Sequence, residues 1–395
     1  MIRLELNKSA SKLYGYDNFF VNFFAPGRID ILGNLNEING GEVLSCTINL
    51  GTYLAIAENN FGYHRFFSKN FSQRDFVTVP LNYFVPVQIE SWINYPVGIL
   101  NEFSSRGIIF NKGYDFYYYS NMPIGAGLAS SASIGLVTAL GLNHFLETYY
   151  PLEDLVKMAN VSENTFVNKY ANVKDQFNIG FSRKNNLLKF NTSTLTYKYI
   201  NFDDSNVKML LIHGTKPLQV INTYASRVSE SKHILKVLNI AKKTNIKNLC
   251  SLDYNKLEDY SNTLKLEKSI KRIKYILLEN KLVSDAELYL YNKNYDLFGN
   301  LLYTSHKALK ECYEYTVDEL DTIVDFLYKN KNCLGAKMIN SNNTGCVLAL
   351  FNNNISTEYL EALKTELNTL YQRETECNLE FYDICTNDGV EKCTL

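Results

Sequence analysis

The chain has 395 residues, which is long for a single hydrophobic core and sufficient for two. Hydrophobic residues make up 46% of it and charged residues 21%, a composition typical of a globular protein and not of a disordered or fibrous one. The formal net charge is -1, so no overall field would draw the chain to nucleic acid or to an anionic membrane. We therefore expect a small-molecule partner and neither a nucleic acid nor a membrane.

The same simple features indicate the cellular location. The sequence contains no apolar run long enough to cross a membrane, and its amino terminus lacks the apolar segment and cleavage site of a secretory signal. The cysteines and histidines show none of the spacings typical of zinc sites. We expect a cytoplasmic protein, and we expect it to be a monomer.

The first half of the chain reads as several strands followed by a mixture of helices and strands. Residues 21–81 hold four runs rich in aromatic and β-branched residues, separated by turn-forming residues. Beyond them, changes in hydrophobic period predict alternating elements. These are a helix at 90–103, a strand at 114–121, helices from 130 and over 152–170, and strands at 187–190 and 196–200. A polar run at residues 202–206 follows, and we place the first domain at residues 1–205.

The second half begins with a strand at residues 207–214, which a long helix-rich stretch follows. Its last part alternates between apolar strand patterns and one amphipathic helix. The expected elements are strands at 334–340 and 345–351, a helix at 357–371 and a strand at 379–385. Helices packed on a small antiparallel sheet fit this order, so we predict an α+β chain whose second domain spans residues 206–395.

A glycine-rich loop, NMPIGAGLASSAS at residues 121–133, precedes one of the expected helices. Glycine lets the backbone approach a bound anion, because no Cβ intervenes and unusual dihedral angles cost little. The amino end of the following helix offers unpaired N–H groups and a partial positive charge, so the combination predicts a phosphate-binding loop. The alternative is a tight turn whose serines cap the helix. The candidate phosphate contacts are Pro123, Gly125, Ala126, Gly127, Leu128, Ala129, Ser130 and Ser131.

The segment PIGAGLASSAS closely resembles the P-x-x-x-G-L-S-S-S-A loop of the GHMP small-molecule kinases, named for galactokinase, homoserine kinase, mevalonate kinase and phosphomevalonate kinase. FAPGRIDILGNLNEINGGEVL, residues 24–44, looks like the amino-terminal signature of the galactokinase branch, A-P-G-R-V-N-L-I-G-E-H-T-D-Y-N-G-G. SWINYPVGIL, SENTFVNKYANVKDQF and NTYASRVSES resemble further family segments in the family's order. The resemblance implies the two-domain GHMP kinase fold, with an N-terminal domain of ribosomal-protein-S5-like type and a C-terminal ferredoxin-like α/β sandwich.

The resemblance also implies a reaction, the ATP-dependent phosphorylation of the anomeric hydroxyl of a monosaccharide. Asp175 matches the family's catalytic aspartate, and a carboxylate can accept the proton of a sugar hydroxyl. Arg28 matches its arginine, which can pair with Asp175 and stabilise charge on the transferring phosphoryl group. Mg²⁺ needs only one or two protein oxygens beside those of ATP, and Ser131 and Glu163 match the family's metal-proximal residues. Without the resemblance, Arg28 would read as a surface ion-pair residue and Glu163 as a solvated carboxylate.

The departures from the family pattern lie where the sugar would bind. Asn34, Leu35 and Glu37 stand in place of the family's sugar-contacting Glu, His and Asp. Asn172 replaces a glycine, and Lys174 replaces a methionine next to the catalytic aspartate. Lys174 is either a solvated lysine that points outward or a contact to phosphate or an acidic sugar. With Tyr224 of the Y-x-x-R pair, these residues form our candidate substrate site, and their exchange should change sugar preference.

The third glycine-rich family motif, G-A-R-M-T-G-A-G-F-G-G-C, appears here as GAKMINSNNTGC, so three glycines become Asn340, Asn342 and Thr344. Asparagine tolerates a left-handed backbone better than threonine does. Two functions stay open: a sugar kinase with an altered pocket, acting on galactose, an amino sugar, a pentose or a hexuronate, and a catalytically silent sugar and nucleotide sensor. Retention of the catalytic pair and of the two metal-proximal residues favours the enzyme.

Overall fold

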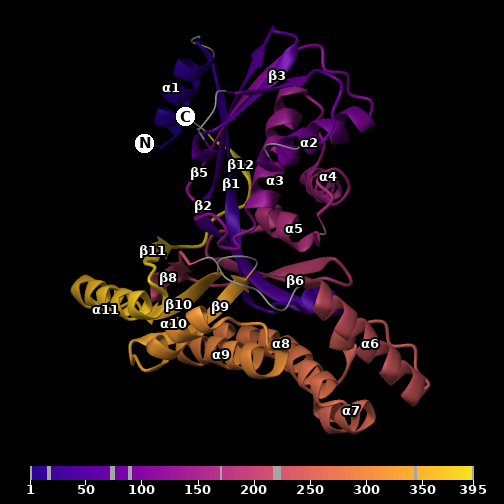
Figure 1. Cartoon of the computed structure of the whole chain (residues 1–395), viewed down its shortest axis with the longest axis vertical. Coiled ribbons are helices and arrows are strands. Elements are labelled where there is room, and N and C mark those ends of the chain that lie inside the picture. The colour runs from indigo at the N-terminus through magenta and orange to yellow at the C-terminus, as the bar shows by residue number, and fades with distance from the viewer. Residues whose placement is uncertain are drawn as a thin grey trace.

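The computed structural model describes residues 2–15, 19–71, 76–87, 91–169, 171–216, 224–341 and 345–393. Two β-sheets, each covered by helices, lie one above the other (Figure 1). This is the two-domain arrangement expected from the sequence. No helix of the described residues is long and apolar enough to span a membrane. The cytoplasmic location and the monomeric state stay predictions.

The first sheet is built around the 18-residue strand β2, which pairs with β1 on one side and with β5 and β6 on the other. The strand order is β12-β1-β2-β5-β3-β4, and β7 pairs with β6. Only the pairing of β3 with β5 is parallel among the described strands of this sheet. The strands are β1 (Val21–Leu32), β2 (Glu42–Asn59), β3 (Tyr63–Ser68), β4 (Val77–Pro80), β5 (Gly113–Ser120), β6 (Asn186–Asn191), β7 (Thr196–Asn201) and β12 (Glu391–Lys392).

The two faces of this sheet bind different helices, because alternate residues of a strand point to opposite sides. Leu54 and Ile56 of β2 join the core beneath the larger helical layer, whereas Ala55 and Ala57 pack against the amino-terminal helix α1 (Ile2–Tyr14). The larger layer contains α2 (Asn94–Ser105), α3 (Ser130–Phe145), α4 (Leu152–Thr165) and α5 (Lys174–Phe181). Each face therefore has its own apolar core.

The second sheet has four antiparallel strands in the order β11-β8-β10-β9, and helices pack against it (Figure 1). Its strands are β8 (Val207–Gly214), β9 (Cys333–Ser341), β10 (Gly345–Asn352) and β11 (Leu379–Ile384). The helices of this half are α6 (Tyr224–Lys242), α7 (Leu257–Leu264), α8 (Glu267–Tyr291), α9 (Tyr295–Ala308), α10 (Asp318–Tyr328) and α11 (Thr357–Thr375). The small antiparallel sheet with helices agrees with the sequence-based expectation.

One apolar cluster joins the two halves. It contains Ile29 and Ile31 of β1, Leu282 of α8, Leu302 of α9 and Leu348 of β10, all completely or almost completely buried. At the other end of the chain, β12 pairs with β1, so the carboxyl-terminal segment lies beside the first sheet (Figure 1). The division at residue 205 stays a prediction, and the apolar cluster crosses it.

The sequence patterns did not predict two of the helices. The first is α1, whose apolar side docks on the sheet through a small cluster. The second is the eight-residue α5, which begins immediately before Asp175 and is too short to show a helical period.

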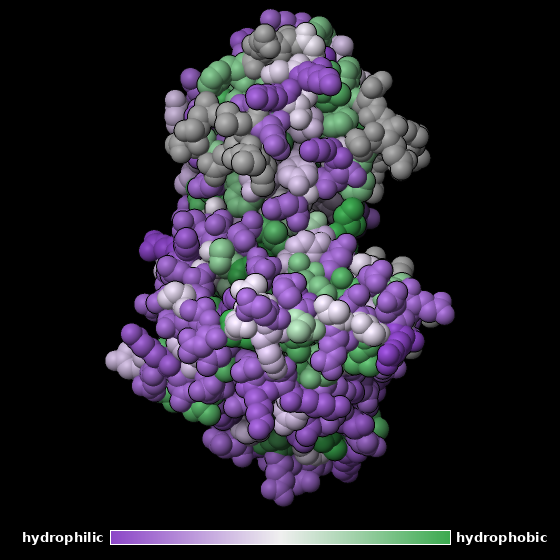
Figure 2. All heavy atoms as spheres, turned by 90° about the vertical axis from the view of Figure 1, so that its left-hand side faces the viewer, coloured by the Kyte–Doolittle hydropathy of each residue, from purple (hydrophilic) through white to green (hydrophobic). Residues whose placement is uncertain are grey.

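The molecular face seen in Figure 2 is largely hydrophilic over its lower part, where apolar residues are scattered among polar ones.

Candidate active site

A cavity of about 560 Å³ is lined by residues from both halves of the molecule. All of the candidate residues named from the sequence line it. They are Arg28, Asn34, Leu35, Glu37, Pro123, Gly125, Ala126, Gly127, Leu128, Ala129, Ser130, Ser131, Glu163, Asn172, Lys174, Asp175 and Tyr224. The fold thus brings together segments more than a hundred residues apart in the sequence, while the roles of the residues stay predictions.

The glycine-rich loop bends tightly before α3. Gly125 and Gly127 both have φ of 77°, a left-handed conformation that glycine adopts without a Cβ clash. Ala129, also left-handed, is the N-cap of α3, and no side chain caps the helix there. The interpretation of this segment as a turn capped by its serines is therefore wrong. Instead, the amino end of α3 lies at the cavity, where its N–H groups and partial charge suit an anion.

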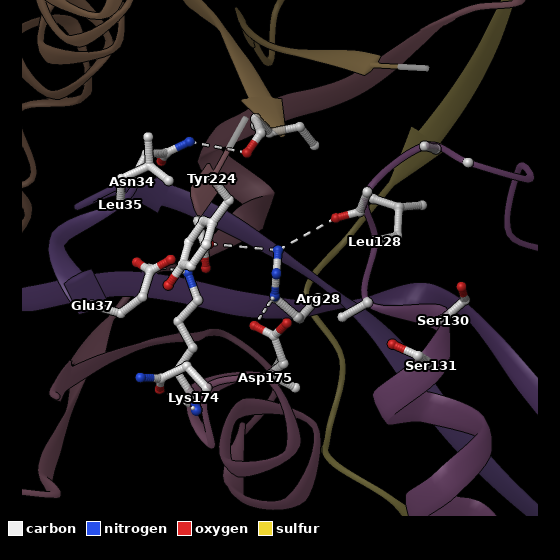
Figure 3. Close-up of a pocket in the computed structure, with 18 of the residues that line it drawn as sticks. Arg28, Asn34, Leu35, Glu37, Leu128, Ser130, Ser131, Lys174, Asp175 and Tyr224 are labelled. Carbon is white, nitrogen blue, oxygen red and sulfur yellow. Dashed lines mark hydrogen bonds and ion pairs between the residues drawn. The ribbon is translucent and has the colours of Figure 1, made fainter. Parts of the chain in front are cut away.

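Arg28 and Asp175 meet at the centre of the cavity (Figure 3). Arg28 Nε donates to Asp175 Oδ1 at 2.8 Å, and Nη1 donates to the carbonyl of Gly127 at 3.4 Å. The arginine is only 3% exposed, so it is not a surface ion-pair residue. Burial alone would lower the pKa of Arg28, but the carboxylates of Asp175 and Asp30 outweigh it and raise that pKa above its usual value. The guanidinium is therefore a permanent charge at this point.

Lys174 lies in the wall of the cavity and is not solvated. It is 6% exposed, and its ammonium lies 2.8 Å from Asp30 Oδ2 and 3.1 Å from Glu37 Oε2. Burial opposes the charge of Lys174, yet the two carboxylates raise its pKa above the usual value. The outward-pointing alternative is thus wrong, and the ammonium is already paired within the protein.

Asp30 is a cavity residue that the sequence analysis missed. Burial favours its neutral form, but Arg28 and Lys174 together lower the pKa of Asp30. Its Oδ1 is buried and has no hydrogen-bond partner among the described residues. The signal was present in the sequence, because the resembled signature has Asn at this position and Met at position 174. An acid and a base replace this neutral pair, and they meet in the structure.

The turn after β1 holds the other exchanged residues. Leu35 has φ of 65° and ψ of 7°, a left-handed conformation that is rare for a branched side chain. Asn34 donates through Nδ2 to the carbonyl of Ile339 and accepts at Oδ1 from Lys337, both at 3.0 Å. The side chain of Asn34 is therefore held by β9, although it reaches the cavity wall. Burial raises the pKa of Glu37, and Lys174 opposes that shift.

Glu163 lies beside the glycine-rich loop at Ser131. It is 4% exposed, which excludes a solvated helical carboxylate, and Gln176 Nε2 donates to its Oε2 at 2.8 Å. Burial raises the pKa of Glu163, while a hydrogen bond with Ser131 opposes the shift. The described residues contain no group of three or more His, Cys, Asp or Glu side chains that could hold a metal. A carboxylate with a neighbouring hydroxyl still fits Mg²⁺, which takes its other ligands from phosphates and water.

Arg227 and Asn172, both singled out in the sequence, make hydrogen bonds within the protein. Arg227, the partner of Tyr224 in the Y-x-x-R pair, is fully buried and donates to Glu230 and to the carbonyl of Glu314. Asn172 accepts a hydrogen bond from the backbone N–H of Lys174 and so supports the start of α5. Asn342 and Thr344 of the third motif lie outside the described residues, as does the side chain of Asn340.

Comparisons with known proteins agree with this arrangement. The family model described as the N-terminal domain of GHMP kinases matches residues 94–182, and the one described as the galactokinase galactose-binding signature matches residues 11–58. The chain is 32% identical to a galactokinase of Lactiplantibacillus plantarum over 368 residues, covering 93% of this chain and 94% of the relative. It is 30% identical to a galactokinase of Bacillus subtilis over 393 residues, covering 99% of each.

Solved structures extend the comparison. The structure of Lactococcus lactis galactokinase complexed with galactose matches all of both chains with a TM-score of 0.90 and 25% identity. The mevalonate kinase of Methanococcus jannaschii shares the fold, with a TM-score of 0.65 and 19% identity over 94% of this chain and 99% of the other. Fold and cavity thus define a GHMP small-molecule kinase, a phosphotransferase that uses ATP and acts on a sugar hydroxyl. Within that superfamily, the chain belongs to the galactokinase branch.

Proposed function

We propose that this protein transfers the terminal phosphoryl group of ATP to the anomeric hydroxyl of a neutral hexose, with galactose as the first candidate. The observation that carries the proposal is the 2.8 Å contact between Arg28 and Asp175. In Figure 3 this pair lies between Leu128, Ser130 and Ser131 on one side and Asn34, Leu35, Glu37 and Lys174 on the other. One bound nucleotide and one sugar would meet there. The galactose bound by the Lactococcus lactis relative supports the choice of sugar.

Two side chains would carry the chemistry. Asp175 lies in the first turn of α5 with its side chain 26% exposed, so a sugar hydroxyl can approach it and give up its proton as the bond to phosphorus forms. Arg28 would stabilise charge on the transferring phosphoryl group. The N–H groups of the loop and of α3 would hold the polyphosphate. Ser131 and Glu163 would hold Mg²⁺, which neutralises phosphate charge when bound.

The charges on the sugar side favour a neutral substrate over a hexuronate. Lys174 is the cation that could have received a substrate carboxylate, and Asp30 and Glu37 already pair with it. An added carboxylate would instead meet these two acids in a buried site, where like charges repel strongly. The unpartnered Oδ1 of Asp30 suits a donor, either a sugar hydroxyl or the ammonium of an amino sugar. A neutral pentose also fits this charge pattern.

Release of ADP across a panel of sugars tests the proposal. The panel contains galactose, galactosamine, arabinose and galacturonate, together with a reaction that lacks sugar. We expect turnover with galactose, none with galacturonate, and none in the Asp175→Asn variant. Asp259→Asn is the matched control, because this residue of α7 pairs with Lys242 outside the cavity. Binding of a sugar without any ADP release would contradict the enzyme and support a sensor.

A further inference from the structure

A buried ion pair lies beneath the turn that follows β1. Glu279 of α8 and Lys337 of β9 are both 0% exposed, and their Oε1 and Nζ atoms are 3.6 Å apart. Both residues belong to the second half of the chain, whereas the turn that they contact belongs to the first. Burying two charges is costly unless further hydrogen bonds satisfy them, so the partners of this pair indicate what it holds.

Glu279 binds the backbone of the turn. Its Oε1 accepts the N–H groups of Gly33 at 2.8 Å and Asn34 at 3.2 Å, and the hydroxyl of Ser305 at 3.0 Å. One helical turn earlier on α8, Tyr275 donates its hydroxyl to the carbonyl of Asn34 at 2.9 Å. Side chains on one face of α8 therefore form hydrogen bonds with both the N–H and the carbonyl of Asn34.

Lys337 of β9 binds the side chain of Asn34. Its Nζ donates to Asn34 Oδ1 at 3.0 Å and to the hydroxyl of Ser305 at 2.8 Å. The remaining polar group of Asn34, its Nδ2, donates to the carbonyl of Ile339. All four polar groups of this residue are thus bound by the second half of the chain.

The turn needs such support because its backbone is strained. Gly33 has φ of 85°, and a Cβ there would lie 2.4 Å from the carbonyl oxygen of Glu42. Leu35 is left-handed, a conformation that is unfavourable for a non-glycine residue with a branched side chain. Leu35 and Glu37 of this turn line the sugar side of the cavity. A small change in the turn would therefore move the groups that face the substrate.

We propose that Glu279 and Lys337 are positioning residues that hold the turn at residues 33–37 in its sugar-binding shape. The second half of the chain would thereby influence sugar affinity through residues that do not contact the sugar. This inference rests on the proposed sugar-kinase function. Because Glu279 and Lys337 do not line the cavity, loss of the pair should affect sugar binding and leave ATP binding unchanged.

The test compares three variants with the wild type by steady-state kinetics, calorimetric sugar binding and thermal unfolding. In Glu279→Gln we expect the KM and the dissociation constant for sugar to rise by about tenfold to about a hundredfold, with kcat and the KM for ATP nearly unchanged. Glu287→Gln is the matched control. Glu287 also lies on α8 and also binds the first half, through Lys189 at 3.1 Å and through Lys198, but outside the cavity.

A double variant, Glu279→Gln with Lys337→Gln, separates positioning from stability. It removes both buried charges, so it should recover much of the thermal stability that the single variant loses. The sugar constants should stay raised, because the contacts to Asn34 are still altered. If the Glu279→Gln variant does not fold, the sugar constants of the double variant alone test the proposal.

Wild-type sugar constants in the double variant would overturn the proposal. An equal loss in kcat and both KM values that follows the loss of folded protein would overturn it as well. Sugar binding without turnover in the wild type would contradict the enzyme, yet the calorimetric comparison would still test the positioning role. Absence of sugar binding in the wild type would overturn both.

Discussion

The two ends of the cavity are built from different groups. The end to which we assign the phosphates is formed by the loop with two left-handed glycines and by the amino end of α3, and it keeps the spacing of the resembled family loop. The end to which we assign the sugar is lined by side chains, several of which depart from the family pattern. We call them the phosphate end and the sugar end. A backbone site tolerates sequence change as long as the loop keeps its shape. A site of buried side chains tolerates it only when the neighbouring residues change as well.

Asp30 and Lys174 illustrate this difference. Each alone would leave a buried charge without its nearest partner, whereas together they form a 2.8 Å ion pair. Glu37 and Arg28 extend the cluster on either side, at 3.1 Å from Lys174 and 3.5 Å from Asp30. The sugar end has therefore changed as a unit, while the phosphate end has changed little.

The largest effect is expected at the residue that joins the two ends. Arg28 contacts Gly127 on the phosphate side and both Asp175 and Asp30 on the sugar side. Arg28→Lys keeps a charge but loses the planar fork, so we expect kcat to fall by about a thousandfold, equivalent to about 4 kcal/mol. Steady-state ADP release measures this effect. Arg106→Lys, which changes an arginine paired with Glu102 on α2, should leave kcat unchanged.

The compensated pair gives the second prediction. Lys174→Met should lower the free energy of unfolding by about 3 kcal/mol, because it leaves two buried carboxylates without their shared cation. Asp30→Asn should cost less, since Glu37 still faces Lys174. In the variant that carries both exchanges, part of the stability should return, because only Glu37 then lacks its cation. Urea unfolding of all four proteins measures the coupling, and simple additivity of the two single effects would show that the pair is not compensatory.

The third prediction concerns a buried histidine outside the cavity, which is neutral in the folded protein, in contrast to the paired charges at the sugar end. His64 is 0% exposed, its Nε2 faces the carbonyl of Leu81, and its Nδ1 accepts the N–H of Tyr114, each at 3.2 Å. Burial lowers the pKa of His64 from 6.5 to about 4. The unfolded chain therefore takes up a proton near pH 6.5, but the folded protein does so only near pH 4. As the pH decreases from about 6.5 to about 4, the free energy of unfolding should therefore decrease by about 3 kcal/mol.

Urea unfolding at pH 7 and at pH 4 measures the decrease in the free energy of unfolding, in the wild type and in His64→Gln. The glutamine amide can replace both hydrogen bonds but does not titrate. The difference between wild type and variant isolates the histidine from other titrating groups. An equal loss in the two proteins would contradict the assignment.

The smallest effect is expected at the phosphate end. Gly127→Ala adds a Cβ at φ of 77°, which costs about 1 to 2 kcal/mol of backbone strain. We expect the KM for ATP to rise by about tenfold and calorimetric sugar affinity to stay unchanged. Gly107→Ala is the control, because Gly107 also has a positive φ, of 89°, but lies outside the cavity and has open space around its Cβ position. A larger change in sugar affinity than in the KM for ATP would contradict the division of the cavity into two ends.

The sequence predicted the parts of the site that depend on local spacing. The glycine loop, Arg28 and Asp175 could be found because family motifs fix their order along the chain, and all line one cavity. The pairing of Lys174 with Asp30 and Glu37 was not predicted, because these residues lie 144 and 137 positions away and meet only through the fold, and the exchange at residue 30 was not connected with the one at 174. The same is true of Glu279, which lies in no motif, and of Lys337, which lies in the third glycine-rich motif but meets Asn34 only through the fold. Helix α1 was missed because its apolar residues dock on a small cluster instead of the main core.

The most direct test of this account is a crystal structure with galactose and a nonhydrolysable ATP analogue. The account predicts the polyphosphate along residues 125–131 and the anomeric hydroxyl within about 2.6 to 3.2 Å of a carboxylate oxygen of Asp175. A sugar whose anomeric hydroxyl points away from Asp175, or a nucleotide bound outside the cavity, would contradict it.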